Sequence, residues 1–345
     1  MGLCIETNVE LASRTTLELG GPASHFASVR DESALVEALA WARSRGLGVF
    51  VLGGGSNVLV PDGGVDGLVI DLQLRGVSLS DRGAQVIVRA AAGEPWDELV
   101  ARSCDAGLVG IECLSGIPGR VGATPIQNVG AYGQEVADVI TQVRTLDRDS
   151  GAIAWWPASE CGFGYRDSRF KRAPAAAIVL EVEYALRRDV AVVPRYAELA
   201  AALAEGGASG PTDARRVVLA LRRAKSMVID ASDENRRSAG SFFTNPVVAV
   251  EVADAVFERA GEPGPRWPQA DGRVKLAAGW LIERAGFTRG LRRGHVGISS
   301  KHALALVHHG GGTTAELLAL AEEIVGAVRQ RFGVTLEREP VLLGG

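Results

Sequence analysis

Glycine is concentrated in two short stretches of this chain, and they restrict the fold more than any other sequence feature. Residues 53–67 hold six glycines, and residues 110–133 hold another six. The first stretch opens with GGGSN, directly after the apolar run VFVL. Because glycine has no Cβ, consecutive amides in such a turn can approach an anion closely. The pattern predicts a strand followed by a pyrophosphate-binding turn, with a tight turn that binds nothing as the alternative.

Neither common nucleotide-binding fingerprint explains these glycines. The sequence GGGSNV does not satisfy G-x-G-x-x-G, and the chain contains no G-x-x-x-x-G-K-[ST]. The second stretch, GIECLSGIPGRVGATPIQNVGAYG, alternates small residues with amides that both donate and accept hydrogen bonds. Such a segment suits an extended polar ligand, such as an isoalloxazine or a nucleotide. A well hydrogen-bonded surface loop is the alternative.

Composition excludes several classes of protein. With 47% apolar residues and a net charge of −4, the chain is neither disordered nor held to nucleic acid by bulk charge. Its four cysteines form no C-x-x-C pair and no zinc spacing, so we expect reduced thiols and no metal site. The first residues include Glu6 and Glu10 and no apolar core, so we do not expect them to be a secretory signal, and no run of 18 apolar residues occurs. We therefore expect a cytoplasmic protein with neither a nucleic-acid nor a membrane partner.

Hydrophobic periodicity predicts a mixed α+β protein. The last predicted helix has a capping box, Thr313-x-x-Glu316. GGASGP, at residues 206–211, is the best linker candidate and suggests a domain boundary near 206–213. Helices are predicted over residues 31–45, 94–108, 188–209, 214–225 and 313–332, and strands over 49–52, 68–72, 84–90 and 176–185.

Five motifs follow one another along nearly the whole chain, from about residue 17 to residue 344. They are GGGSN, PIQNVGAYG, CGFGYRDSRFK, AGSFFTNP and QADGRVKLAAGWLIE. In this order they resemble the UDP-N-acetylenolpyruvoylglucosamine reductases, the MurB flavoenzymes, in the branch with a tyrosine-bearing loop. The resemblance implies a vanillyl-alcohol-oxidase-like FAD-binding module of two subdomains plus an α+β substrate-binding domain. The implied boundaries are 1–75 joined by 336–345, then 76–212, then 213–335.

The resemblance also implies the reaction. It is an oxidoreductase reaction in which NADPH reduces FAD, and the reduced flavin passes hydride to UDP-N-acetylglucosamine enolpyruvate. The product is UDP-N-acetylmuramate, a peptidoglycan precursor. We expect a monomer. No histidine lies between His25 and His295, so an oxidase-type covalent flavin link near the glycine turn is not expected.

Three positions match the family's catalytic residues. Ser241 would donate the proton to the enolic intermediate, Arg166 would grip the substrate carboxylate, and Glu339 would orient or stabilise the same centre. Glu337 is the alternative glutamate, because Arg338 replaces an expected proline. Without the motifs, the serine would be read as structural, the arginine as a partner of Asp167 and the glutamate as solvated.

The remaining candidates also follow from the resemblance. Trp267 stands where tyrosine is expected, so the phenol hydroxyl that would form a hydrogen bond there is missing. The FAD-binding candidates are Gly53, Gly54, Gly55, Ser56, Asn57, Gly119, Gly122, Ala123, Thr124, Gln127, Asn128, Gly130 and Ala131. The substrate-binding candidates are Tyr132, Tyr196, Lys225, Asn245, Lys275 and His302.

Two other functions stay open at this point. An oxidase or dehydrogenase on the same FAD scaffold would act on an alcohol or sugar. A flavin-binding protein without turnover would lack the set formed by Arg166, Ser241 and Glu339, which is intact here.

Overall fold

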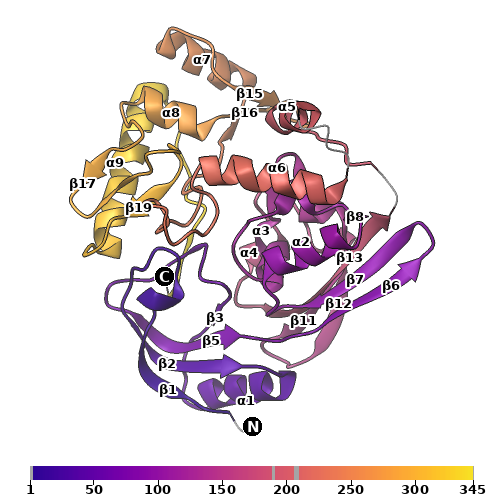
Figure 1. Cartoon of the computed structure of the whole chain (residues 1–345). Coiled ribbons are helices and arrows are strands. Elements are labelled where there is room, and N and C mark those ends of the chain that lie inside the picture. The colour runs from indigo at the N-terminus through magenta and orange to yellow at the C-terminus, as the bar shows by residue number, and fades with distance from the viewer. Residues whose placement is uncertain (1–2, 189–190, 206–209, 345) are drawn as a thin grey trace. The chain divides into compact units, whose positions relative to one another are not determined.

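The computed structural model describes residues 3–188, 191–205 and 210–344, and the chain forms two compact units (Figure 1). The first unit comprises Met1–Val9, Ala23–Gly54 and Asp66–Ile229. The second comprises Glu10–Pro22, Gly55–Val65 and Asp230–Gly345. One boundary between the units therefore falls inside the GGGSN turn, between its second and third glycines.

The first sheet of unit 1 has four strands in the order β1 (Glu6–Glu10), β2 (Pro22–Val29), β5 (Val65–Leu72) and β3 (Val49–Leu52). The helix α1 (Glu32–Arg43) buries Leu35, Ala38 and Ala42. It begins where the Asp31 carboxylate accepts a hydrogen bond from the Ala34 N–H at 2.8 Å, an N-cap that satisfies an amide with no partner inside the helix. Strand β3 leads directly into the glycine turn, as predicted.

The second sheet of unit 1 is antiparallel, in the order β12 (Ile153–Pro157), β11 (Ile140–Asp147), β13 (Ala177–Arg188), β7 (Gln85–Ala91) and β6 (Val77–Arg82). Strand β8 (Leu108–Val109) also pairs with β13. Figure 1 shows α2 (Trp96–Asp105), α3 (Thr124–Gln127), α4 (Arg169–Arg172) and α6 (Pro211–Ala224) gathered over one face of this sheet. Both sheets contribute to a single hydrophobic core.

Unit 1 also contains short elements, several of them within or next to the second glycine stretch. They are the 3₁₀ turns Glu112–Leu114, Val121–Ala123 and Val136–Asp138, the hairpin β9 (Gly130–Ala131) with β10 (Gln134–Glu135), the 3₁₀ turn Ala158–Glu160, and helix α5 (Ala197–Glu205).

Unit 2 is built around the long helix α9 (Thr314–Phe332). Its capping box forms as predicted, because the Thr313 side chain accepts from the Glu316 N–H and the Glu316 side chain accepts from the Thr313 N–H. The Asp62 carboxylate adds a second cap by accepting from Thr314 N at 2.7 Å and Ala315 N at 2.9 Å. Gly333, with φ 73°, ends the helix in the left-handed conformation that glycine favours.

The other elements of unit 2 are short. They are the 3₁₀ turn Ala12–Arg14, α7 (Val250–Ala260), α8 (Ala278–Arg284), the sheet β14 (Val247–Val248), β16 (Val274–Leu276) and β15 (Arg266–Pro268), the sheet β17 (Arg292–Arg293), β18 (Val296–Ile298) and β19 (Leu306–His308), and the parallel pair β4 (Val58–Leu59) and β20 (Val341–Leu342).

Most predicted elements are present, and the α+β class is confirmed. The helix predicted over 94–108 ends at Asp105, because Gly107 has φ 73° and the chain continues as β8. Within the predicted helix 188–209, only Ala197–Glu205 is helical among the described residues. The short strands of unit 2 were not predicted, since two or three residues carry too little periodicity.

The predicted boundary near 206–213 does not coincide with the division into units. Residues 206–209 of the linker candidate lie outside the described part, and α6 belongs to unit 1, where it packs against α2. Asp97 on α2 and Arg215 on α6 pair at 2.5 Å and 2.8 Å. The three-part domain division stays a prediction. No helix in the described ranges combines the length and apolarity that a membrane crossing needs.

Candidate active site

Three candidate residues in unit 1 have the left-handed backbone conformation. Asn128, Tyr132 and Arg166 have φ of 41°, 50° and 53°. For residues other than glycine this conformation costs roughly 1–2 kcal/mol each. Such strain persists where the surroundings impose it, and it gathers at functional sites. The second glycine stretch and the Arg166 loop are therefore held in a specific arrangement.

Asn128 provides much of that constraint. Its Nδ2 donates to Glu135 Oε2 and to the Gly164 carbonyl, both at 2.8 Å. Its Oδ1 accepts from the Ala137 N–H at 3.2 Å, and the residue is 1% exposed. The side chain proposed for FAD binding is thus buried in contacts with the protein. Its observed role is to join the 128–137 segment to the Arg166 loop.

Arg166 extends towards the second glycine stretch. Its guanidinium donates to the carbonyls of Asn128, at 3.4 Å, and Gly130. Lys171 Nζ donates to the Arg166 carbonyl at 2.8 Å. Asp167, the alternative partner considered from the sequence, forms an ion pair with Arg172. Carbonyl contacts orient the guanidinium, which suits binding of a delocalised carboxylate.

The two glycine stretches meet within unit 1. A Cβ on Gly54 would lie 2.7 Å from Gly119 Cα, and one on Gly122 would lie 2.6 Å from Ala92 Cβ. These glycines are therefore required by backbone packing. Gly53 differs, because a Cβ there would meet only Ala123 Cβ, at 4.0 Å.

Gln127, four residues after Ala123, carries an unpaired buried acceptor. Its Oε1 is buried, and no hydrogen-bond donor reaches it from the described residues. Leaving a buried acceptor unpaired costs about 1–3 kcal/mol, which a donor on a bound ligand would recover. The amide oxygen and the open space at Gly53 fit a large polar cofactor such as FAD. By contrast, the Thr124 hydroxyl is bonded to the Val121 carbonyl and Tyr184 Oη, both at 2.8 Å.

Three of the substrate-binding candidates, all in unit 1, lie close together. The rings of Tyr132 and Tyr196 meet edge to face with centroids 5.7 Å apart. Lys225 Nζ lies 5.9 Å from the Tyr132 ring centroid and 2.6 Å from Glu198 Oε2 on α5. Burial raises the pKa of Tyr132 to about 12, so its hydroxyl stays protonated. The group offers one cation and two phenols.

Unit 2 brings Ser241 and Glu339 into adjacent segments. The Glu339 N–H donates to the Phe242 carbonyl at 3.0 Å, and the Thr244 N–H donates to the Glu337 carbonyl at 3.0 Å. Residues 337–339 thus run beside 242–244, directly after Ser241. Glu339 is half-buried whereas Glu337 is exposed, which favours Glu339 as the functional glutamate.

The C-terminal half of the GGGSN turn lies beside the same segment. Asn57 Nδ2 donates to the Glu339 carbonyl at 3.4 Å, and the Val341 N–H donates to the Asn57 carbonyl at 3.1 Å. A Cβ on Gly55 would collide with the Arg14 carbonyl, so this glycine is also required by packing. The turn therefore connects directly to the candidate glutamate.

The other three substrate-binding candidates occupy separate positions in unit 2. Asn245 Oδ1 accepts from Ala278 N at 2.9 Å, which caps the start of α8. Lys275 faces Trp267 across the β15–β16 pair, with Nζ 5.9 Å from the ring centroid. His302 is half-buried in the turn that precedes β19.

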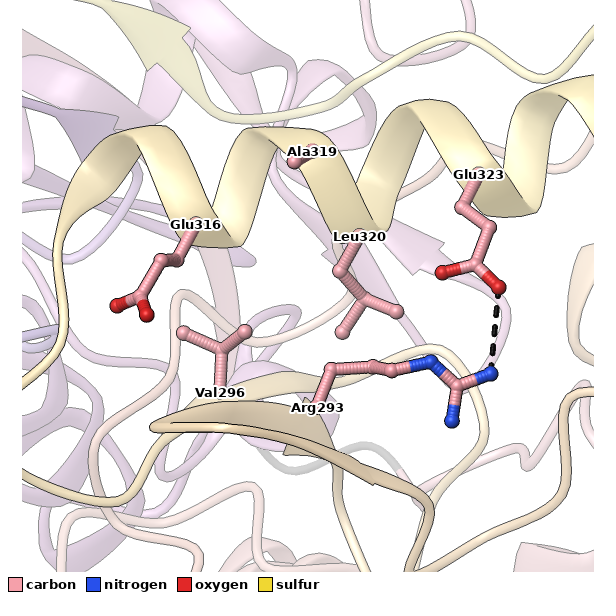
Figure 2. A pocket seen from close by; sticks show the side chains of 6 residues that line it. All are labelled: Arg293, Val296, Glu316, Ala319, Leu320 and Glu323. Carbon is pink, nitrogen blue, oxygen red and sulfur yellow. Dashed lines mark hydrogen bonds and ion pairs between the residues drawn. The ribbon is translucent and has the colours of Figure 1, made fainter.

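Sequence reasoning missed Lys171 as a residue that holds Arg166 in place. Two signals were available, because the chain has only four lysines and this one lies inside the CGFGYRDSRFK motif. A small cavity of about 240 Å³ beside α9 includes none of the candidates (Figure 2). It contains the ion pair of Arg293 and Glu323, at 3.2 Å, and carries no chemistry for the site.

Two family models match the chain. The FAD binding domain matches residues 23–155, and the C-terminal domain of UDP-N-acetylenolpyruvoylglucosamine reductase matches residues 232–343. The first match, together with the fold, confirms the expected flavin-binding class and non-Rossmann scaffold.

Relatives that align over nearly the whole chain carry the same family name as the C-terminal domain match. Proteins named UDP-N-acetylenolpyruvoylglucosamine reductase from Thermobifida fusca and Nocardia farcinica are 47% and 49% identical, over 98% and 99% of this chain and 97% and 91% of theirs. The crystal structure of the Thermus caldophilus reductase, MurB, aligns over 99% of both chains with a TM-score of 0.67 and 28% identity. The chain belongs to the UDP-N-acetylenolpyruvoylglucosamine reductase family.

Proposed function

We propose that this protein reduces UDP-N-acetylglucosamine enolpyruvate to UDP-N-acetylmuramate, with FAD as cofactor and NADPH as hydride donor, in peptidoglycan precursor synthesis. The observation that carries the proposal is the pairing of residues 337–339 with 242–244, which sets Glu339 beside the residue that follows Ser241. A serine acid and a carboxylate in adjacent segments suit the protonation of a carbanionic carbon. The cytoplasmic location and monomeric state expected from the sequence remain part of this proposal.

Residues of unit 1 would hold the flavin. Gly53 leaves open space, and the buried Gln127 Oε1 offers an acceptor for a ring or ribityl donor. A flavin held by these residues would supply the hydride relay between NADPH and the enolpyruvyl double bond. Side chains of the protein then have to stabilise the negative charge that hydride addition leaves on the substrate and supply the proton that neutralises it.

Reduction of the double bond needs one hydride and one proton. Hydride addition at one carbon leaves negative charge on its neighbour, delocalised into the carboxylate. Arg166, oriented by the carbonyls of residues 128 and 130, stabilises that charge with its guanidinium. The Ser241 hydroxyl gives its proton to the charged carbon and recovers one from solvent. Glu339 orients this centre.

The nucleotide end of the substrate would bind at Tyr132, Tyr196 and Lys225. Lys225 is paired with Glu198 in the structure, so a diphosphate would compete with this carboxylate for the ammonium group. Tyr196 is 39% exposed and can donate its phenol to a phosphate oxygen. Exchange of one anionic partner for another keeps the lysine charge compensated in both states.

A single assay tests the proposal. The purified protein should be yellow, and UDP-N-acetylglucosamine enolpyruvate should stimulate its oxidation of NADPH. A colourless protein that FAD cannot reconstitute would refute the proposal. Reoxidation of the reduced flavin by oxygen with an alcohol or sugar as reductant would favour the oxidase alternative, and flavin binding without turnover would favour the binding protein.

A further inference from the structure

We propose that Asn235, with Asp233, Ser300 and Lys301, forms a clamp whose role is to position Ser241 for proton transfer. The inference rests on the proposed function, and it adds a set of positioning residues that act through the placement of Ser241. We call these four residues the Asn235 clamp.

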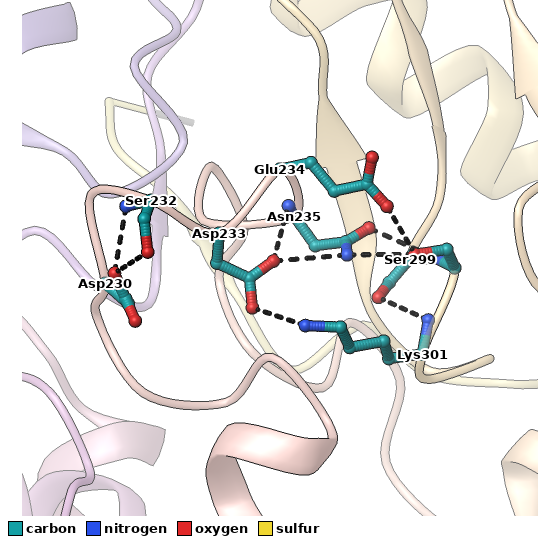
Figure 3. Close-up of polar contacts among 8 residues, drawn as sticks. Asp230, Ser232, Asp233, Glu234, Asn235, Ser299 and Lys301 are labelled. Atoms are coloured by element: carbon teal, nitrogen blue, oxygen red, sulfur yellow. Dashed lines mark hydrogen bonds and ion pairs between the residues drawn. The ribbon is translucent and has the colours of Figure 1, made fainter.

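The clamp joins two loops through a buried amide (Figure 3). Asn235 is 2% exposed. Its Oδ1 accepts from the Ser300 N–H at 3.0 Å, and its Nδ2 donates to Ser300 Oγ at 3.0 Å. The same Nδ2 and the Asn235 N–H both reach Asp233 Oδ1, at 3.3 Å and 2.8 Å. Both the oxygen and the nitrogen of the amide are thus hydrogen-bonded, as a buried polar group requires.

An ion pair closes the clamp at the surface. Lys301 Nζ donates to Asp233 Oδ2 at 2.9 Å, so the carboxylate connects the lysine of one loop to the asparagine of the other. The Asp233 side chain is only 10% exposed, whereas that of Lys301 is 41% exposed. Ser300 Oγ also donates to Glu234 Oε1 at 2.8 Å.

The loop fixed by the clamp binds the residue next to Ser241. The Ser299 N–H donates to the Ala305 carbonyl at 2.8 Å, which closes the loop into a compact turn. The Leu304 carbonyl of this turn accepts from the Phe242 N–H at 2.7 Å. The position of Phe242 therefore depends on where the clamp holds residues 299–305.

The other side of Ser241 is anchored separately. The His308 N–H donates to the Arg237 carbonyl at 2.9 Å, and Thr16 Oγ1 donates to the Ser238 carbonyl at 2.6 Å. Between these anchors, Gly240 has φ 71° and turns the chain. Ser241 thus lies on a short span held at both ends, and the hydroxyl position follows from the spacing of the two anchors.

Proton transfer from a serine depends strongly on the position of its hydroxyl. Serine has a weak acidity in water and acts only when held close to the carbon it protonates. A misplacement of about 1 Å can cost about 100-fold in rate. The clamp should therefore affect proton delivery and leave flavin reduction by NADPH unchanged.

The test uses single-turnover measurements on the FAD-loaded full chain. Asn235→Ala should lower the limiting rate of flavin reoxidation by the enolpyruvyl substrate about 10- to 100-fold. The rate of flavin reduction by NADPH should change less than about 2-fold. Ser300→Ala removes one end of the amide contact and should give a smaller loss, about 2- to 10-fold. Arg293→Met, which breaks an ion pair of unit 2 outside the clamp, is the control.

A double variant decides between positioning and general destabilisation. In a Ser241→Ala background, Asn235→Ala should have almost no further effect on reoxidation, because it acts through the missing hydroxyl. Losses that multiply, or an equal fall in flavin reduction, would overturn the clamp. If Asn235→Ala does not fold, the same comparison with Ser300→Ala decides. A wild-type protein whose flavin the substrate never reoxidises would overturn the proposed function itself, whereas active wild type with multiplying losses overturns only the clamp.

Discussion

Replacement of Ser241 by alanine should separate the two half-reactions. The hydroxyl donates to no other group within the described residues, and the backbone bonds at Phe242 are unaffected by its loss. We therefore expect the free energy of unfolding to change by less than about 0.5 kcal/mol. Loss of a positioned acid lowers the rate about 10²–10⁴-fold, which corresponds to about 2.7–5.4 kcal/mol of transition-state stabilisation.

The assay follows the flavin absorbance in two separate mixing experiments. NADPH should bleach the variant's flavin at nearly the wild-type rate, while the enolpyruvyl substrate should restore the absorbance 10²–10⁴-fold more slowly. Ser232→Ala is the matched control, because it removes an exposed hydroxyl from the preceding loop. Among the described residues this hydroxyl is bonded only to Asp230 Oδ1, at 2.6 Å. An equal fall of both half-reactions, or no fall in the second, would refute the role of Ser241 as proton donor.

Three further predictions concern other parts of the chain. Lys225→Ala should raise the KM for the UDP-sugar about 10- to 100-fold without slowing flavin reduction, since it removes a charge-assisted contact; steady-state kinetics with unchanged KM would contradict this. Burial raises the pKa of the Cys104 and Cys113 thiols to about 12, so at pH 8 a thiol reagent should label the exposed Cys4 in the native protein and all four cysteines only after unfolding. Asp62→Ala should lower the free energy of unfolding, measured in urea, by about 1 kcal/mol, because it removes one of the two caps of α9; Asp66→Ala, at an exposed site four residues further along the chain, should change it by less than about 0.5 kcal/mol.

Local sequence patterns were sufficient to predict those elements that are stabilised by residues close together along the chain. The capping box at Thr313, the helix after Asp31 and the strand before GGGSN all form as predicted. In the two helix caps the interacting groups are within three residues of one another, so spacing alone specifies the contact. The strand was predicted from its apolar run, although its pairing partners on β5 lie 19 residues away. The resemblance also identified the family, because five motifs in the same order along the chain are specific to it, whereas the spacing within a single motif is not.

Contacts between residues far apart in the sequence could not be predicted from local patterns. The glycine turn was interpreted as a ligand cradle, yet Gly54 and Gly55 are required because backbone from Gly119 and Arg14 approaches them. Asn128 was assigned to the cofactor, yet its side chain is buried in contacts with Glu135 and the Gly164 carbonyl. Neither partner could be deduced from local sequence, because both depend on how separate segments pack.

The sequence by itself determined the fold class, the family and most helices, since hydrophobic periodicity, caps and ordered motifs act locally or are read directly from the residues. Only the tertiary structure revealed that residues 337–339 run beside 242–244 and that Lys171 donates to the Arg166 carbonyl. It also revealed that Asn235 joins the loops on which Ser241 depends. The physical reason is that hydrogen bonds between residues far apart in the chain require close packing of both segments, and the spacing of residues along a sequence does not specify that packing.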